Sequence, residues 1–251
     1  MIHPYLDNDG PLAFAHRGGA SVHPENTERA FRHAVELGFT HLETDVHVTR
    51  DGVVVAFHDE RLDRVTDQTG AIADLDWDSV RQARVNGTDE ICRLDDLLAG
   101  FPATRFNLDP KHDAAVEPLI EVLRRSAAVE RVCVTSFSRR RTRRVKAGIG
   151  ARLCTGAGPG QVVATLGAGW RIPLPVRGID ALQVPVRVGP LAVVTPRFID
   201  AAHRKGLHVH VWTIDHAAEI GRLLDLGVDG IMTDEPEVLR SVYRSRGHWP
   251  D

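Results

Sequence analysis

Residues 12–36, LAFAHRGGASVHPENTERAFRHAVE, hold the pattern on which the fold prediction depends. The apolar run at 12–15 predicts a short strand, and the helical pattern at 27–36 predicts the helix that follows it. Between them, Gly18 and Gly19 allow a tight turn in which the backbone can lie close to a ligand. Gly38 comes after the helix, as glycine commonly does at helix C-termini. The stretch therefore predicts one strand–loop–helix unit.

The same order of elements recurs along the whole chain. Further strands are predicted at 41–48, 53–57, 105–108, 131–135, 151–154, 181–184, 207–212 and 230–232, and further helices at 94–98, 114–127, 139–146, 159–166, 196–205, 216–226 and 237–244. If one hairpin strand is set aside, about eight strand–helix units remain, which predicts a parallel TIM (β/α)8 barrel. A Rossmann sheet is the alternative, but no G-x-G-x-x-G follows the first strand. We therefore expect one α/β domain over residues 1–251, with its active residues at the C-terminal ends of the strands.

Composition narrows the class of protein. The net charge is −3, so no overall basic field favours nucleic acid as a partner. The three cysteines have no metal-type spacing, which favours a reducing compartment such as the cytoplasm. The N-terminus lacks the apolar stretch of a signal peptide, and no apolar run reaches the length of a transmembrane helix. The sequence offers no basis for predicting an oligomeric state.

Residues 59–93 interrupt the alternation of strands and helices. They are rich in aspartate and contain only a weak helical pattern after Asp76. Long insertions in barrels commonly shape the substrate site, so we predict that this segment lies over the barrel mouth. The alternative is a surface loop without a role.

Two carboxylates stand on the second strand, which leads into a predicted hairpin. Glu43 and Asp45 are two residues apart, so their side chains share one face of the strand. A two-residue Asp51-Gly52 loop would place Val48 opposite Val55 and Val46 opposite Phe57, with Asp45 and His58 as the next pair. This predicts a carboxylate close to a histidine. The alternative is that the acidic residues only cap or solvate the strand ends.

Two other strand ends carry polar side chains of matching chemistry. His16 and Arg17 follow the first strand, and the guanidinium fork of Arg17 can hold phosphate oxygens. Asp109 and Lys111 end the strand at 105–108, and Pro110 favours the extended backbone that puts them on one face. A carboxylate and a lysine suit a metal and a phosphate respectively. Taken alone, a His-Arg pair is more often a surface accident, and Asp109 with Lys111 is more often an ordinary salt bridge.

The last two strands carry less certain signals. His208, His210 and Trp212 alternate on one strand, and we expect the two histidines to be buried, neutral and hydrogen-bonded. Trp212, nearest the strand end, either forms an aromatic wall for a substrate or packs in the core. The segment 233–236, Thr-Asp-Glu-Pro, is interpreted as structural, capping the last helix with a proline in its first turn.

Together these motifs resemble the glycerophosphodiester phosphodiesterase family, whose members are TIM barrels of the phospholipase-C-like type. The resemblance extends over nearly the whole chain in the family's order. It rests on His16-Arg17-Gly18, Pro24-Glu25-Asn26-Thr27, Glu43-Thr44-Asp45-Val46, Thr49-Arg50-Asp51-Gly52, His58-Asp59, Lys111, Val211-Trp212-Thr213 and Thr233-Asp234-Glu235-Pro236.

The resemblance implies a function and a role for each site residue. It implies that His16 and His58 act as acid and base, and that Arg17 and Lys111 hold the phosphate. Glu43 and Asp45 would bind a divalent cation, with Asp109 where the family commonly has a longer glutamate. A set of oxygen ligands favours Mg²⁺ or Ca²⁺, with Mn²⁺ possible. The implied reaction is hydrolysis of a small glycerophosphodiester to an alcohol and glycerol 3-phosphate, and the sequence does not identify the alcohol.

Two other functions remain open at this point. One is a non-catalytic barrel that binds phosphorylated ligands. The other is a lysophospholipase D acting on lysophospholipids, for which the basic run at 139–146 could contact anionic headgroups. That run lacks a broad apolar face, so a solvated helix surface on the outer ring is the favoured interpretation.

Overall fold

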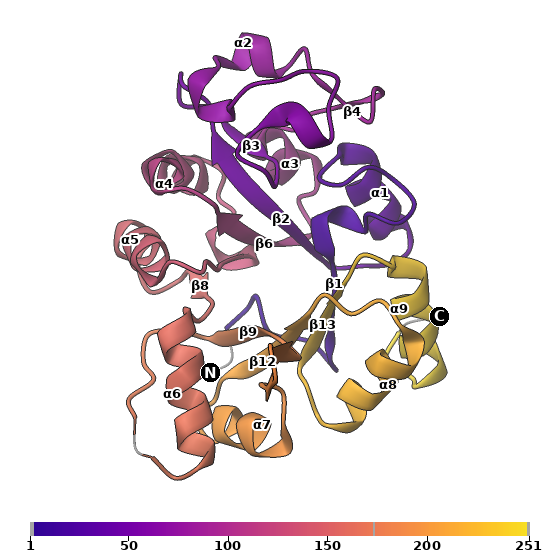
Figure 1. Cartoon of the computed structure of the whole chain (residues 1–251), viewed down its shortest axis with the longest axis vertical. Helices are drawn as coiled ribbons and strands as arrows, with labels where there is room; N and C mark the ends of the chain where they lie inside the picture. The colour runs from indigo at the N-terminus through magenta and orange to yellow at the C-terminus, as the bar shows by residue number, and fades with distance from the viewer. Residues whose placement is uncertain (1–2, 173, 250–251) are drawn as a thin grey trace.

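The computed structural model describes residues 3–172 and 174–249, and eight parallel strands form a ring at its centre (Figure 1). Neighbours around the ring follow the order β8-β7-β6-β2-β1-β13-β12-β9. The bounds are β1 Leu12–Ala15, β2 His41–Val48, β6 Arg105–Pro110, β7 Val132–Val134, β8 Cys154–Thr155, β9 Ala181–Pro185, β12 His208–Trp212 and β13 Gly230–Thr233. A single parallel bridge, between Gly156 and Ala181, joins the ends of this order. The predicted TIM barrel is confirmed.

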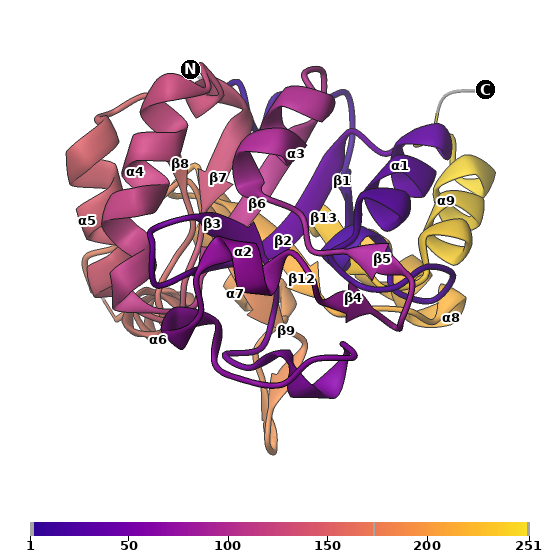
Figure 2. The same ribbon diagram turned by 90° about the horizontal axis from the view of Figure 1, so that it is seen from above.

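Helices surround the strands (Figure 2), and all but the last of them, which follows β13, lie between one strand of the ring and the next in the sequence. α4 illustrates why they form, because Val116, Leu119, Ile120 and Leu123 recur at helical spacing and are buried against the sheet. Each helix predicted from the sequence is present, with bounds that differ by a few residues. They are α1 Glu28–Glu36, α3 Leu94–Gly100, α4 Val116–Arg125, α5 Arg139–Ile149, α6 Pro159–Gly169, α7 Pro196–His203, α8 Ala217–Asp225 and α9 Pro236–Ser245.

The N-terminal segment closes the barrel at the end where the strands begin. Tyr5 is fully buried there, and its carbonyl oxygen lies 3.0 Å from Nε2 of His41, the first residue of β2. Its ring packs in a cluster with the inward-facing residues Phe14, Cys133 and Met232. The bottom of the barrel is therefore filled by side chains, and any open cavity has to lie at the opposite end.

One of the two histidines of β12 is as predicted. His210 is fully buried, with its Nδ1 3.4 Å from the amide nitrogen of Gln183, and burial holds its pKa well below the usual value. Burial also lowers the pKa of His208, which is only partly covered. The prediction is therefore confirmed for His210. It was wrong for His208, which is only half-buried and whose Nδ1 has no hydrogen-bond partner among the described residues.

The hairpin after β2 differs from the prediction by one residue. β3, Val54–Ala56, pairs with β2 so that Val48 faces Val54 and Val46 faces Ala56. The turn contains three residues, Arg50 to Gly52, and not two, and the amide of Gly52 donates to Thr49 in the manner of a wider turn. Asp45 consequently bonds through its carbonyl oxygen to the amide of Phe57, and not to His58. The predicted register was wrong, but His58 still follows β3 directly.

The insertion at 59–93 has a small core of its own. Its short elements are η2 Leu62–Arg64, η3 Ile72–Asp74, α2 Trp77–Val80, β4 Arg84–Val85 and β5 Asp89–Glu90. Leu62, Ile72, Val80 and Val85 pack against the outer side of β3 and the residues beside it. In Figure 1 the insertion stands beside the ring of strands, next to β3, and leaves the centre open to view. Its role as a lid stays a prediction.

The basic run at 139–146 forms most of α5. Arg141 bonds to Asp113 at 2.8 Å and Arg144 to Glu117 at 2.8 Å, so two of its guanidinium groups are paired with the neighbouring chain segment. This supports the interpretation as a solvated surface of the outer ring. Among the described helices, none has the length and apolar character needed to cross a lipid bilayer.

Candidate active site

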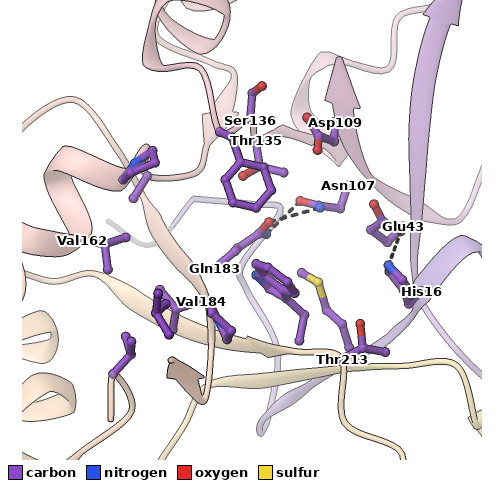
Figure 3. A pocket seen from close by; sticks show the side chains of 18 of the residues that line it. His16, Glu43, Asn107, Asp109, Thr135, Ser136, Val162, Gln183, Val184 and Thr213 are labelled. Carbon is purple, nitrogen blue, oxygen red and sulfur yellow. Dashed lines mark hydrogen bonds and ion pairs between the residues drawn. The ribbon is translucent and has the colours of Figure 1, made fainter. Parts of the chain in front are cut away.

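A cavity of about 470 Å³ opens at the end of the barrel where the strands finish. All eight residues predicted as site residues line it, although they come from five different strand ends. Figure 3 shows part of this lining, with His16, Glu43 and Asp109 on one side and Val162 and Val184 on the other. The predicted residues are His16, Arg17, Glu43, Asp45, His58, Asp109, Lys111 and Trp212. The structure therefore brings the whole predicted set together.

The loop after β1 is held in an unusual conformation by its glycines. It forms a 3-10 turn, η1 His16–Gly18, in which Arg17 has a positive φ of 51°. Gly18 has a φ of 88°, and a Cβ there would lie 2.8 Å from that of Ala30 on α1. A Cβ on Gly19 would meet Pro236 of α9 at 2.7 Å. Only glycine fits both positions, and this close packing fixes where His16 and Arg17 point.

His16 lies between two carboxylates. Its Nδ1 is 2.8 Å from Oδ1 of Asp234, and its Nε2 is 3.8 Å from Oε2 of Glu43. Burial acts to lower the pKa of His16, but Glu43 and Asp234 outweigh it, so the pKa is raised. The contact with Asp234 fixes the orientation of the ring and leaves Nε2 directed toward the other polar residues of the cavity.

His58 has a similar partner on the other side of the site. Its Nδ1 is 2.6 Å from Oδ1 of Asp59, and its carbonyl oxygen is 3.1 Å from Nε2 of His47. Arg64 of the insertion donates from Nε to Asp59 at 2.5 Å and also bonds to Glu25. The bond from Arg64 lowers the pKa of Asp59 to about 2, so this carboxylate stays ionised beside His58.

The three predicted metal ligands lie on two adjacent strands, β2 and β6. In their parallel register Asp45 faces Asp109, and Glu43 lies two residues before Asp45 on the same face. Lys111 places its Nζ 2.6 Å from Oδ1 of Asp45 and 2.8 Å from Oδ2 of Asp109. Arg17 adds a second cation, with its backbone N–H donating to Glu43 at 3.0 Å and its Nε 3.3 Å from Asp45.

Burial and crowding perturb these carboxylates. Burial, together with the charge of Asp45, raises the pKa of Glu43 to about 7. Burial also raises the pKa of Asp109, although Lys111 opposes the shift. Burial would lower the pKa of Lys111, but Asp45 and Asp109 reverse this effect and raise it. Glu43 is therefore the carboxylate that gains most from an added positive charge.

The three carboxylates have the oxygen ligands that a hard divalent cation prefers, but their side chains are not arranged around a common point. Glu43, Asp45 and Asp109 are buried oxygen donors, and Oδ2 of Asp45 accepts no hydrogen bond from the described residues. Among residues 3–172 and 174–249, however, no three acidic, histidine or cysteine side chains are close enough to share an ion. The ammonium of Lys111 takes the place between Asp45 and Asp109 instead.

The remaining wall of the cavity has a different character. Every charged residue in the lining lies at or before Lys111, and every later residue of the lining is uncharged. Asn107 and Gln183 exchange two hydrogen bonds across the barrel, at 3.1 and 2.8 Å (Figure 3). Trp212 meets Phe137 edge to face, with ring centroids 5.9 Å apart. The site thus has a charged half and an apolar half.

Several site residues were missed or misread in the sequence. The segment 233–236 was interpreted as structural, and Pro236 does stand in the first turn of α9 as predicted. Among the described residues, however, no side chain caps α9, and the side chain of Asp234 bonds to His16. The reason is that a carboxylate just before a helix can accept a hydrogen bond either from the backbone of that helix or from a side chain on another element. Asp59, Glu25 and Arg64 were not predicted as partners of His58 or Arg17. The adjacency of Asp59 to His58 was the one signal available.

Comparison with known proteins places this geometry in context. The model of the glycerophosphoryl diester phosphodiesterase family matches residues 16–238. A probable glycerophosphodiester phosphodiesterase 2 from Mycobacterium tuberculosis is 41% identical over 98% of this chain and 95% of its own. The structure also superposes on a putative glycerophosphoryl diester phosphodiesterase from Silicibacter pomeroyi, at 22% identity, full coverage of both chains and a TM-score of 0.83. A phosphodiesterase from Oleispira antarctica, solved in complex with the product sn-glycerol-3-phosphate, has a TM-score of 0.77 at 20% identity, covering 93% of this chain and 97% of its own.

Proposed function

Since the chain belongs to the glycerophosphoryl diester phosphodiesterase family, we propose that it hydrolyses glycerophosphodiesters to an alcohol and glycerol 3-phosphate, with His16 and His58 as acid and base. One observation carries this proposal: both imidazoles line one cavity, and each has its Nδ1 bound to a carboxylate. That pairing keeps the proton on Nδ1 and leaves Nε2 for exchange with a substrate.

The two histidines would divide the proton transfers. One takes the proton of the attacking oxygen, which belongs to water or to a neighbouring glycerol hydroxyl of the substrate. As the new P–O bond forms, the other histidine gives its proton to the oxygen of the departing alcohol, and the old P–O bond breaks. When the glycerol hydroxyl attacks, the first product is a cyclic phosphate, and water then opens the ring to give glycerol 3-phosphate, with the two histidines in exchanged roles. Each transfer of this kind contributes about 10²–10⁴-fold to the rate.

Arg17 and Lys111 would bind the phosphate of the substrate. Both cations are held in place by carboxylates, Arg17 by Glu25 at 3.1 Å and Lys111 by Asp45 and Asp109. Since these groups are positioned before the substrate arrives, little reorganisation is needed as negative charge builds on the phosphorus oxygens.

A divalent cation would be held by Glu43, Asp45 and Asp109, with Mg²⁺, Ca²⁺ or Mn²⁺ as the candidates. When bound, such a cation supplies further neutralisation of phosphate charge. The raised pKa of Glu43 supports the proposal, as does Oδ2 of Asp45, which accepts no hydrogen bond from the described residues and has only the ion pair with Nε of Arg17 at 3.3 Å. Because Lys111 now pairs with Asp45 and Asp109, we expect the affinity for the cation to rise in Lys111→Met, which calorimetric titration of the apo enzyme would measure.

Product analysis of glycerophosphocholine hydrolysis tests the function. Release of glycerol 3-phosphate, with and without EDTA, should show turnover and its dependence on the cation. His16→Ala and His58→Ala should each lose at least about 100-fold in kcat while keeping the melting temperature. A diester of glycerol phosphate with p-nitrophenol needs no proton at the leaving oxygen, so it should restore turnover in the variant that lacks the acid.

Two results would contradict the proposal. Binding of glycerophosphodiesters without any turnover would favour a non-catalytic barrel. Near-normal kcat in either alanine variant would overturn the acid–base assignment while leaving the family and the fold intact.

A further inference from the structure

One arginine of the insertion bonds to two carboxylates beside the candidate active site. The guanidinium of Arg64 donates to both oxygens of Asp59, from Nε at 2.5 Å and from Nη2 at 3.1 Å. It also donates to both oxygens of Glu25, from Nη1 at 3.1 Å and from Nη2 at 2.7 Å. The side chain of Arg64 is 48% exposed, so water screens each bond taken alone, and the four bonds from one planar group together fix it.

Each of the two carboxylates contacts a residue of the cavity. Oδ1 of Asp59 lies 2.6 Å from Nδ1 of His58, and Oε1 of Glu25 accepts a hydrogen bond from Nη1 of Arg17 at 3.1 Å. The five side chains therefore form one continuous row, His58–Asp59–Arg64–Glu25–Arg17. One end of the row is a proposed acid or base and the other a proposed phosphate ligand, whereas Arg64 itself does not line the cavity.

The row connects three segments of the chain. His58 and Asp59 follow β3, Arg17 and Glu25 stand between β1 and α1, and Arg64 belongs to the insertion. β1 pairs with the first residues of β2, and β3 pairs with its last. The side chain of Arg64 therefore links two loops that start from different parts of the sheet.

The backbone that carries Arg64 is held by the small core of the insertion. Leu62, two residues earlier, is fully buried in that core, and its amide donates to the carbonyl oxygen of Gly70 at 3.0 Å. The insertion also contacts α1, which stands next to it in Figure 1, since Arg29 donates to Asp89 of β5 at 2.5 Å. These supports do not depend on the side chain of Arg64.

We propose that Arg64 is a positioning residue for the reaction: through Asp59 it orients His58, and through Glu25 it orients Arg17. The proposal rests on the function given above, and it gives the insertion a supporting role at the site. A planar guanidinium with donors along two edges holds two carboxylates in a fixed relation, which a single ammonium does not. The groups for proton transfer and for phosphate binding would thereby keep one geometry before the substrate arrives.

Arg64→Met tests the proposal, because it keeps the apolar stem and removes the guanidinium. Misplacement of supporting groups costs about 10–100-fold in activity, so kcat/KM for glycerophosphocholine should fall by that factor. The loss should appear in both constants: kcat falls because His58 is no longer oriented, and KM rises because Arg17 is no longer held. A loss of stability alone would change neither constant at a temperature well below the melting point.

Double variants separate the two branches of the row. Asp59→Asn should act mainly on kcat, and Glu25→Gln should act mainly on KM. Since Arg64 acts through these carboxylates, adding Arg64→Met to Asp59→Asn should lower kcat by no more than about 2-fold further. Adding it to Glu25→Gln should likewise raise KM by no more than about 2-fold further.

Two further variants control for charge and for place in the insertion. Arg61→Met should leave kcat and KM unchanged, since Arg61 stands three residues earlier, is also exposed and bonds to Asp63 at 3.2 Å. Arg64→Lys keeps the charge but should remain at least about 5-fold below the wild type in kcat/KM, because one ammonium does not hold both carboxylates. The core of the insertion is unchanged in each variant, so folding should be preserved, which a thermal melt would verify.

The outcomes separate this inference from the proposed function. Turnover of glycerophosphocholine with unchanged kcat and KM in Arg64→Met overturns the positioning role and leaves the function standing. Full activity in Arg64→Lys also overturns it, and so do additive losses in both double variants. Failure of the wild type to hydrolyse the diester overturns the proposed function instead.

Discussion

Asp234 and Asp59 give His16 and His58 the same kind of contact in different surroundings. Asp59 accepts a hydrogen bond from Arg64, whereas the backbone N–H of Asp234 donates to Oδ1 of Asp215, and His16 also lies 3.8 Å from Glu43. The pKa of His16 is raised by Glu43 and by Asp234. The charge of Asp234 should therefore be visible in the pH dependence of the reaction.

Asp234→Asn should lower the pKa of His16 and allow the wrong ring nitrogen to carry the proton. We expect kcat to fall by about 100-fold or more, and the limb of the pH–rate profile that belongs to His16 to move to lower pH. Profiles of kcat/KM from pH 5 to 9 would measure this. Asp225→Asn is the control, since Asp225 pairs with Arg246 on the outer surface. If the limb of the profile does not shift in Asp234→Asn, Asp234 does not influence the titration of His16 and the prediction is wrong.

Glu43 should make the stability of the cation-free protein depend on pH. Its pKa is about 7 in the folded state against a usual 4.5, so the folded state keeps a proton that the unfolded state releases. The contribution of protonated Glu43 to the free energy of unfolding is therefore fully present below about pH 4.5, and it is lost as the pH rises toward 7. Glu43→Gln stays neutral throughout, so its melting temperature relative to the wild type should rise across this window in EDTA. A constant difference would contradict the raised pKa.

At the scale of single elements, the loop between β1 and α1 is the most constrained part of the site. Gly18→Ala should cost about 2–4 kcal/mol, because it combines a positive φ with a contact of 2.8 Å to Ala30. In a chain of this size that lowers the melting temperature by roughly 4–16 °C, and activity should fall as His16 moves. Gly52→Ala is the matched control: its φ is also positive, at 90°, but nothing lies within 4 Å of the added Cβ. Equal effects in both variants would show that packing against α1 does not matter.

Most elements could be predicted from the sequence because each depends on local pattern. Apolar runs and helical periodicity depend on few neighbours, so β1, β2 and the outer helices were predicted within a few residues. The β2–β3 register was not, since a two-residue and a three-residue turn both accommodate Asp51-Gly52. The hairpin formed by β10, Arg187–Val188, and β11, Leu191–Ala192, was missed because strands of two residues have too little sequence to show alternation.

In the candidate site, too, local patterns in the sequence predicted some features and could not predict others. Strand-end position and chemistry were enough to find the eight predicted residues of the cavity. The contact between His16 and Asp234 spans 218 positions in the sequence and arises only when β13 closes against β1, so no local pattern could indicate it.

At the scale of the whole molecule, the N-terminal segment seals the bottom of the barrel. Tyr5→Ala should leave a cavity among Phe14, Cys133 and Met232 and cost about 3–5 kcal/mol, or roughly 6–20 °C in melting temperature. Tyr5→Phe is the informative partner, because the buried hydroxyl of Tyr5 has no hydrogen-bond partner among the described residues. Removing it should leave the melting temperature unchanged or higher. A loss of several degrees in Tyr5→Phe would reveal a partner for the hydroxyl.

The cavity also divides along the chain, with its charged lining in residues 16–111 and its apolar wall in 137–193. The two sides of the apolar wall follow β8 and β9, and in the part of the chain that the structure describes these strands share a single ladder bridge, from Gly156 to Ala181. The two sides of the apolar wall are therefore joined to each other by a narrow seam, which lies apart from His16 and His58. Substitutions in α6 or in the hairpin are expected to reshape this wall while the contacts of the two histidines with Asp234 and Asp59 stay in place.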